Sequence, residues 1–251
     1  MKEQIDTIPV NDAFDAGGEC PFCYLTRQAE QRTLRYVLGP GASYMEPEVR
    51  AATDEKGFCS VHMKKMYDYG NALGNALIMQ TYIVGLLRRF DKQLENYELP
   101  AKKGLLPSRK KPACDAPLIH WAKKTQQSCF ICERIDSHLQ RYYATFYHLI
   151  KEPVFRQKVA KCNGFCFPHF AQLLENAEDH LPNAQRDWFA ATVPALMRDN
   201  LARVQADLDW FIEKFDYRNA SADWKNARDA VSRSMQKLHG IYPADPPYKQ
   251  D

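Results

Sequence analysis

A Cys/His pattern that occurs twice is the feature that most constrains this chain. The first copy has Cys-Pro-Phe-Cys and, after 35 residues, Cys-Ser-Val-His; the second has Cys-Phe-Ile-Cys and, after 33 residues, Cys-Phe-Pro-His. Its members are Cys20, Cys23, Cys59, His62, Cys129, Cys132, Cys166 and His169. A Glu-Pro-x-x-Arg motif lies between the half-motifs of each copy. The matching landmarks are offset by 109, 106 and 107 positions, which indicates an internal duplication.

Each copy carries the donor set of a tetrahedral metal site. Two cysteines three positions apart, where a turn runs into a helix, can direct both sulfur atoms at one ion, and a Cys-x-x-His pair can do the same from another turn. Three thiolates and one imidazole suit zinc. The interval between the half-motifs has room for a helical hairpin. We therefore predict two zinc ions, each joining the CxxC and the CxxH of the same copy.

Two other uses of these cysteines stay open at this point. Cys20 and Cys23 at a helix N-terminus resemble the arrangement that lowers a thiol pKa in disulfide oxidoreductases. The second copy has phenylalanine in place of the proline, however, and a redox role leaves the Cys-x-x-His pairs unexplained. An iron–sulfur cluster on each Cys3His set is the other alternative, because histidine is a minority ligand of such clusters. No role is predicted for Cys114 or Cys162.

Apolar spacing predicts an all-α fold. Residues 135–149 carry apolar side chains at intervals of four, three, four and three, which is one stripe of a helix. A similar rhythm runs from Leu73 to Leu94, and residues 224–238 are predicted to form a last helix. Proline and an acidic residue mark helix starts at Glu46-Pro47 and Glu152-Pro153. The Gly-Phe before each Cys-x-x-His fits a helix that ends in a left-handed glycine.

The chain is predicted to contain two related parts. These are a first metal-binding repeat at 1–97, a linker at 98–118, a second repeat with C-terminal helices at 119–240, and a flexible tail at 241–251. The linker assignment rests on four prolines and five basic residues, which favour an extended segment. The two repeats together predict a pseudo-twofold helical bundle.

A cytoplasmic location is expected. The first 11 residues have no apolar core of signal-peptide length. The longest uncharged run, Tyr69–Leu87, is interrupted by glycine and asparagine and is interpreted as a core helix, not as a membrane span. In the cytoplasm thiols stay reduced, which favours metal ligation over disulfides.

Charge and motifs narrow the function. With 34 basic and 31 acidic residues, the net charge of +3 argues against a globally basic nucleic-acid binder. No phosphate loop or nucleophile–base arrangement is present, so no catalytic residue is assigned. A metal site with four protein ligands also lacks an open position for catalysis. The sequence thus favours a scaffold or interaction role, with an unknown protein or a second copy as partner, and neither membrane nor nucleic acid is expected.

The repeated motifs resemble an uncharacterised family of prokaryotic proteins classed as a domain of unknown function. The resemblance covers residues of about 18–95 and 127–215. The second copy departs from the motif because Cys129-Phe-Ile-Cys132 lacks the proline, although all four ligand types remain. The resemblance implies a metal-binding helical fold and adds no reaction.

Overall fold

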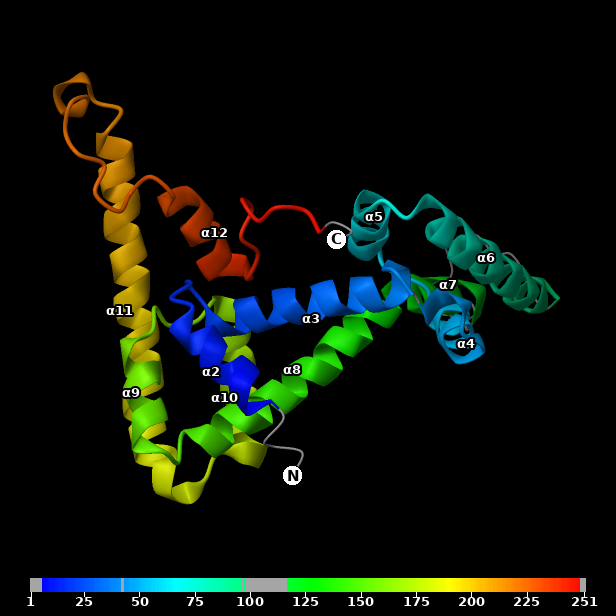
Figure 1. Cartoon of the computed structure of the whole chain (residues 1–251), viewed down its shortest axis with the longest axis horizontal. Helices are drawn as coiled ribbons and strands as arrows, with labels where there is room; N and C mark the ends of the chain where they lie inside the picture. The colour runs from blue at the N-terminus through cyan, green and yellow to red at the C-terminus, as the bar shows by residue number, and fades with distance from the viewer. Residues whose placement is uncertain (1–5, 42, 96, 98–116, 249–251) are drawn as a thin grey trace, which may run out of the picture. The chain divides into compact units, whose positions relative to one another are not determined.

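The computed structural model describes residues 6–41, 43–95, 97 and 117–248, and within them all regular secondary structure is helical (Figure 1). The helices are α2 (Thr7–Asp15), α3 (Pro21–Leu38), η1 (Ser43–Met45), α4 (Pro47–Lys56), α5 (Ser60–Tyr69), α6 (Ala72–Leu94), α7 (Pro117–Gln127), α8 (Phe130–Leu149), α9 (Pro153–Lys161), α10 (Phe167–His180), η3 (Asn183–Gln185), α11 (Arg186–Glu213), η4 (Tyr217–Asn219) and α12 (Ala230–His239). The predicted all-α class is confirmed. Among the described residues no helix is long and apolar enough to cross a bilayer.

Local signals in the sequence place several helix ends. Pro47 and Pro153 begin α4 and α9, and the glutamate before each has an extended backbone at the N-cap position. Proline suits these positions because an N–H in the first turn of a helix has no acceptor within the helix, so its absence costs no hydrogen bond. Gly57 ends α4 with a φ of +63°, and Gly164 has a φ of +76°. Both helix starts are as predicted, and both glycines have a positive φ, but α9 already ends at Lys161, so Gly164 does not end a helix.

The chain forms two compact units that divide it differently from the predicted repeats. Unit 1 comprises Met1–Ala29 and Asp136–Pro246, and unit 2 comprises Glu30–Ile135 and Pro247–Asp251. Helix α3 begins in unit 1 and ends in unit 2, whereas α8 begins in unit 2 and ends in unit 1. The boundaries between the units therefore fall within α3 and α8, and the predicted linker at 98–118 lies inside unit 2. Residues 98–116 of that linker lie outside the described part of the chain, and Pro117 begins α7.

The core of unit 1 is aromatic. Phe22 of α3 stacks on Tyr143 of α8 with ring centroids 4.5 Å apart, and Phe14 of α2 meets Phe155 of α9 at 5.0 Å. Phe165 is fully buried beside them. Such ring pairs supply much of the apolar area that a helical core buries. The predicted apolar stripe of residues 135–149 lies buried in α8, as expected.

Helix α6 of unit 2 faces its neighbours with the side opposite to the predicted one. Its buried residues are Gly74, Ile78 and Tyr82, and it packs on α4. Tyr82 lies so close to Gly57 that a Cβ there would come within 2.6 Å of the ring. The predicted core stripe is exposed instead, with relative exposures between 39% and 67% at Leu73, Val84, Leu87, Phe90 and Leu94. The segment therefore contributes Ile78 and Tyr82 to the core, whereas most of the predicted stripe does not pack there.

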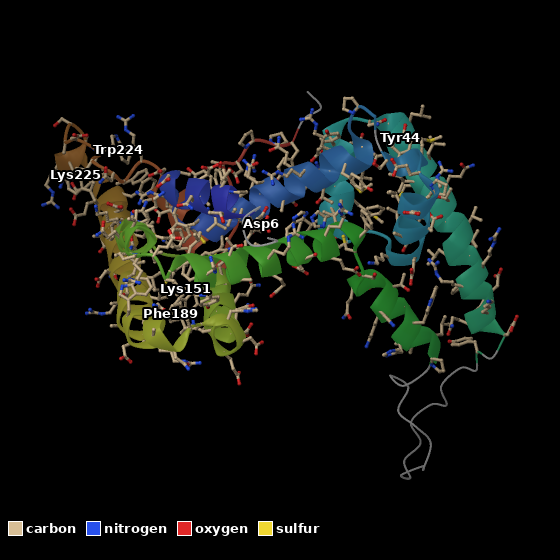
Figure 2. All side chains as sticks on the ribbon, turned by 60° about the horizontal axis from the view of Figure 1, so that its bottom comes forward. Asp6, Tyr44, Lys151, Phe189, Trp224 and Lys225 are labelled. Carbon is tan, nitrogen blue, oxygen red and sulfur yellow. The ribbon has the colours of Figure 1, made fainter. Side chains whose placement is uncertain are left out.

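The C-terminal region also differs from the prediction. Helix α12 begins at Ala230, and Trp224 and Lys225 lie in the preceding loop (Figure 2). Within the segment predicted to be a flexible tail, Tyr248 is buried and donates a hydrogen bond from Oη to Glu30 Oε2 at 2.5 Å. Residues 249–251 lie outside the described part.

Candidate metal centres

All four half-motifs are built in the same way at the start of a helix. Cys20, Cys129, Cys59 and Cys166 immediately precede α3, α8, α5 and α10, and the second ligand of each half-motif is the third residue of that helix. Side chains at the N-cap and N3 positions lie on the same side of a helix N-terminus, as in a capping box. Each half-motif therefore presents its two donor atoms together. The positive end of the helix dipole also favours thiolate there.

The eight predicted residues meet in two groups. Group 1 consists of Cys20, Cys23, Cys166 and His169, and group 2 consists of Cys59, His62, Cys129 and Cys132. In each group the four donor atoms lie within 4.8 Å of one another, so each group can hold one metal ion. All of group 1 belongs to unit 1, and all of group 2 belongs to unit 2.

The predicted pairing of half-motifs is wrong, because each group combines the CxxC of one copy with the CxxH of the other. Helix length gives the reason. The 18 residues of α3 span about 27 Å at ~1.5 Å per residue, whereas the 10 residues of α4 return only about 15 Å. For α8 and α9, with 20 and nine residues, the values are about 30 Å and about 14 Å. In each copy the return helix alone therefore does not reach back to the CxxC at the start of the hairpin.

Group 1 is enclosed by protein. Its four residues are all buried, with relative exposures of at most 7%. Cys23 Sγ lies 3.5 Å from Cys166 Sγ, and His169 Nδ1 lies 3.5 Å from Cys20 Sγ and 3.0 Å from Cys166 Sγ. The Nδ1 atom of the histidine, not Nε2, therefore faces the sulfur atoms.

Group 2 has the same donor geometry and more access to solvent. His62 Nδ1 lies 3.2 Å from Cys59 Sγ and 3.3 Å from both Cys129 Sγ and Cys132 Sγ. The Cys59 and Cys132 sulfur atoms are 3.9 Å apart. His62 and Cys129 are buried, whereas Cys59 and Cys132 are partly exposed. The two groups are thus alike in their ligands and unlike in their enclosure.

A residue of α3 orients each histidine. Thr26 Oγ1 lies 3.2 Å from His169 Nε2, and because its own hydrogen goes to the Phe22 carbonyl, it accepts the Nε2–H. Glu30 Oε1 accepts from His62 Nε2 at 2.9 Å. Holding the proton on Nε2 leaves the Nδ1 lone pair free for a metal ion.

Glu30 belongs to a small buried network in unit 2. It also accepts from Lys65 Nζ at 2.6 Å and from Tyr248. Burial disfavours the carboxylate, but bonds to His62, Lys65 and Tyr248 outweigh it and lower the Glu30 pKa to about 2. The histidine of group 2 is therefore oriented by a charged partner, and that of group 1 by a neutral one.

Without a cation, each group is a proton-sharing cluster. In group 2, burial disfavours the imidazolium, but bonds to Cys129 and Glu30 outweigh it and raise the His62 pKa to about 10. Burial also acts to raise the Cys129 pKa, yet the bond to His62 lowers it to about 6. The pKa of Cys132 is raised, mainly by burial and to a smaller extent by the negative charge of Cys129. A bound cation would favour the thiolate forms of Cys129 and Cys132.

In group 1 the pKa values of the histidine and two of the cysteines are shifted in the same directions as in group 2. Bonds to Cys166 and Cys20 raise the His169 pKa to about 10 against the effect of burial. The Cys20 pKa is well below its usual value, because bonds to Cys166, Cys23 and His169 overcome burial. The pKa of Cys23 is raised, and the largest cause is its hydrogen bond to Cys166.

Several residues around the groups carry no signal in the sequence. Thr26 and Glu30 lie within an ordinary amphipathic helix, and Tyr248 comes from a proline-rich tail. Only the folded chain brings them to the histidines. Cys162, which was assigned no role, belongs to neither group, and Cys114 lies outside the described residues.

We predict that binding of one metal ion to either group releases at least two protons near pH 7. One comes from the imidazolium, whose pKa is about 10, and one from the thiol whose pKa is raised. Because protons compete with the metal, the affinity falls as the pH falls through this range. Calorimetric titration in buffers of different ionisation enthalpy measures the proton count. Release of no protons would contradict the charge states described for both groups.

Comparison with known proteins gives one relative and one family. The chain is 23% identical over 201 residues to the "Uncharacterized 23.9 kDa protein in xynA 3'region" of Caldicellulosiruptor sp. (strain Rt8B.4), an alignment that covers 80% of this chain and 84% of that protein. No solved structure matches the chain. The family match extends over residues 1–245. The chain therefore belongs to DUF6062, a family of unknown function.

Proposed function

We propose that this chain is a helical zinc-binding protein in which each Cys3His group holds one structural zinc ion. The observation that carries the proposal is the convergence of three sulfur atoms and one imidazole nitrogen within 4.8 Å, twice in one chain. Such a donor set suits zinc, which favours tetrahedral sulfur and nitrogen ligands. Zinc also satisfies the charge requirement, because a divalent cation stabilises the thiolates that otherwise repel one another.

The spacing of the donors supports a single ion over an iron–sulfur cluster. Zinc–sulfur bonds of about 2.3 Å place the thiolates of a tetrahedral site roughly 3.8 Å apart. Cys23 Sγ and Cys166 Sγ are 3.5 Å apart in group 1, and Cys59 Sγ and Cys132 Sγ are 3.9 Å apart in group 2. A cluster distributes its four ligands over two or more irons and therefore needs a wider spacing.

A structural role follows from what each ion would connect. Cys23 and Cys166 are 143 positions apart in the sequence, and Cys59 and Cys132 are 73 positions apart. In group 1 the ion would tie the N-terminal segment of unit 1 to the rest of that unit. A cross-link between distant positions removes conformational freedom from the unfolded chain, as a disulfide does. Four protein ligands leave no open position for substrate or water, which supports a scaffold over a catalyst.

Thiol redox chemistry is the second candidate, and the exposure of group 2 favours it. Cys59 and Cys132 are partly exposed, and their sulfur atoms are 3.9 Å apart.

All seven cysteines among the described residues are free. Free thiols persist in a reducing compartment, so a cytoplasmic location is part of the proposal.

An interaction role is supported by α6. Leu73, Val84, Leu87 and Leu94 share one face of this helix, and all four are exposed. Exposed apolar faces of this kind often mark protein interfaces. We propose that a second copy of the chain covers this face, because a symmetric pair buries the same apolar surface on both copies.

Elemental analysis of the purified chain is expected to give about two zinc ions per chain, and Cys59→Ser about one, with a lower melting temperature. The loss of stability is expected because binding energy at a structural zinc site contributes to folding. Cys162→Ser is the matched control and keeps both ions, since Cys162 lies outside both groups. A metal-free, colourless chain in which Cys59 and Cys132 readily form a disulfide would support the redox function instead. A brown chain containing iron would support a cluster.

Leu87→Glu is expected to abolish self-association of the chain while leaving its zinc content unchanged. Leu87 is 54% exposed, so the substitution places a charge on the apolar face without disturbing the core. Sedimentation of both proteins over a range of concentrations measures the effect. A wild-type chain that stays monomeric at every concentration would refute the second-copy proposal.

A further inference from the structure

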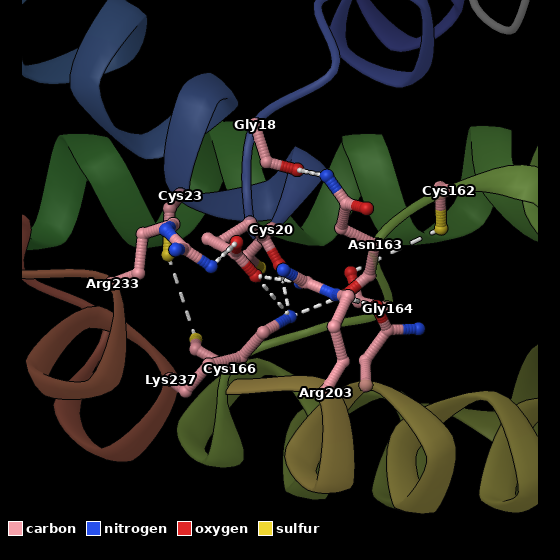
Figure 3. Close-up of polar contacts among 12 residues, drawn as sticks. Gly18, Cys20, Cys23, Cys162, Asn163, Gly164, Cys166, Arg203, Arg233 and Lys237 are labelled. Carbon is pink, nitrogen blue, oxygen red and sulfur yellow. Dashed lines mark hydrogen bonds and ion pairs between the residues drawn. The ribbon is translucent and has the colours of Figure 1, made fainter. Parts of the chain in front are cut away.

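A buried cluster of charges lies beside group 1 and belongs to neither half-motif. It is centred on Lys237 of α12, whose side chain is 1% exposed (Figure 3). Around it, Glu19 pairs with Lys237 at 3.1 Å, with Arg203 at 2.6 Å and with Arg233 at 3.5 Å. Burial of a charged lysine is costly unless its donors are satisfied. This lysine therefore requires a structural explanation.

The Lys237 ammonium bridges the two loops that carry group 1. It donates to the main-chain carbonyl of Glu19 at 2.5 Å and to that of Asn163 (Figure 3). Glu19 immediately precedes Cys20, and Asn163 lies three residues before Cys166. With the Glu19 carboxylate as third partner, all three donors of the ammonium have an acceptor.

Group 2 joins its half-motifs by a different bond. The N–H of Phe130, the residue after Cys129, donates to the carbonyl of Gly57 at 2.9 Å. At the matching position of group 1, Pro21 follows Cys20. Proline has no N–H, so this bond cannot form there. Lys237 supplies the link between the two loops of group 1 from another part of the chain.

The end of the same helix covers the sulfur atoms. Gly240 follows α12 with a φ of +77°, and a Cβ at this position would lie 3.4 Å from Cys166 Sγ and 3.8 Å from Cys23 Sγ. Its carbonyl oxygen is 3.3 Å from Cys23 Sγ. Lys237 lies in the last turn of α12 and Gly240 directly follows the helix, so the C-terminal end of α12 holds the loops and closes the site.

We propose that α12 locks group 1, with Lys237 as a positioning residue that holds the two loops in the metal-binding geometry. The inference rests on the proposed zinc function and adds that the two groups differ in their dependence on α12. Retention of the ion in group 1 depends on docking of α12, whereas retention in group 2 does not. Since coupling between two binding events is reciprocal, metal in group 1 also stabilises the docked helix.

Zinc release from the full-length chain into excess chromogenic chelator tests this coupling. Lys237→Met is expected to accelerate release of one of the two ions about 10- to 100-fold, the range typical for loss of a residue that supports metal ligands. The other ion leaves at the wild-type rate. In a Cys59→Ser background, which keeps only group 1, Lys237→Met accelerates release of the remaining ion.

Lys214→Met is the matched control. Lys214 is also a buried lysine of unit 1, and it donates to the carbonyls of Asn219, Ala220 and Ala222, none of which belongs to either group. It is expected to lower stability while leaving both release rates unchanged. Equal acceleration by Lys214→Met, equal acceleration of both ions, or no effect of Lys237→Met would overturn the proposal. A wild-type chain without zinc would overturn the proposed function together with this inference.

Hydrogen exchange gives a second measurement that does not need a Lys237 variant. Cys20→Ser removes a ligand of group 1, and amide exchange in α12 is expected to become faster. Cys59→Ser removes a ligand of group 2 and leaves exchange in α12 unchanged. The same exchange in both variants would show that α12 does not respond to group 1.

Discussion

The lengths of α3 and α8 determine which half-motifs can meet. An α-helix has a fixed rise, so each of these helices carries the chain about 27 to 30 Å away from the CxxC at its start. The helix that follows covers about half that distance. In the structure each CxxC meets the CxxH of the other copy, and unit 1 is made from two separate segments.

Much of the local structure could be predicted from the sequence, because its causes are local. Pro47 and Pro153 mark helix starts, and the apolar stripe of residues 135–149 forms the buried face of α8. The eight ligands were also predicted from spacing and residue type. Their pairing was not, because it depends on how helices from distant parts of the chain pack, and spacing and residue type do not show this.

The remaining features depend on contacts between distant positions. Lys237 and Gly240 reach group 1 from a helix more than 200 residues away from Cys20, and no local pattern marks them. The exposed face of α6 has the same periodicity as a buried one, so spacing alone could not show which side packs. In the structure the buried side is the one that carries Ile78 and Tyr82, and Tyr82 lies against Gly57.

The two groups share their ligands and differ in their surroundings. Group 1 is buried, its histidine is held by a hydroxyl, and a separate helix links its loops. Group 2 has two partly exposed cysteines, a histidine held by Glu30, and loops linked by their own backbone. Under the proposed function, group 1 is the enclosed structural centre and group 2 the more accessible one.

Zinc content of two double variants tests the exchanged pairing most directly. Cys20→Ser with Cys166→Ser removes two ligands of one group, and the account predicts that one zinc ion per chain remains. Cys20→Ser with Cys59→Ser removes one ligand from each group, and the account predicts that none remains. The reverse result, with no zinc in the first variant and one ion in the second, would show that each copy closes its own site and would contradict the structure described here.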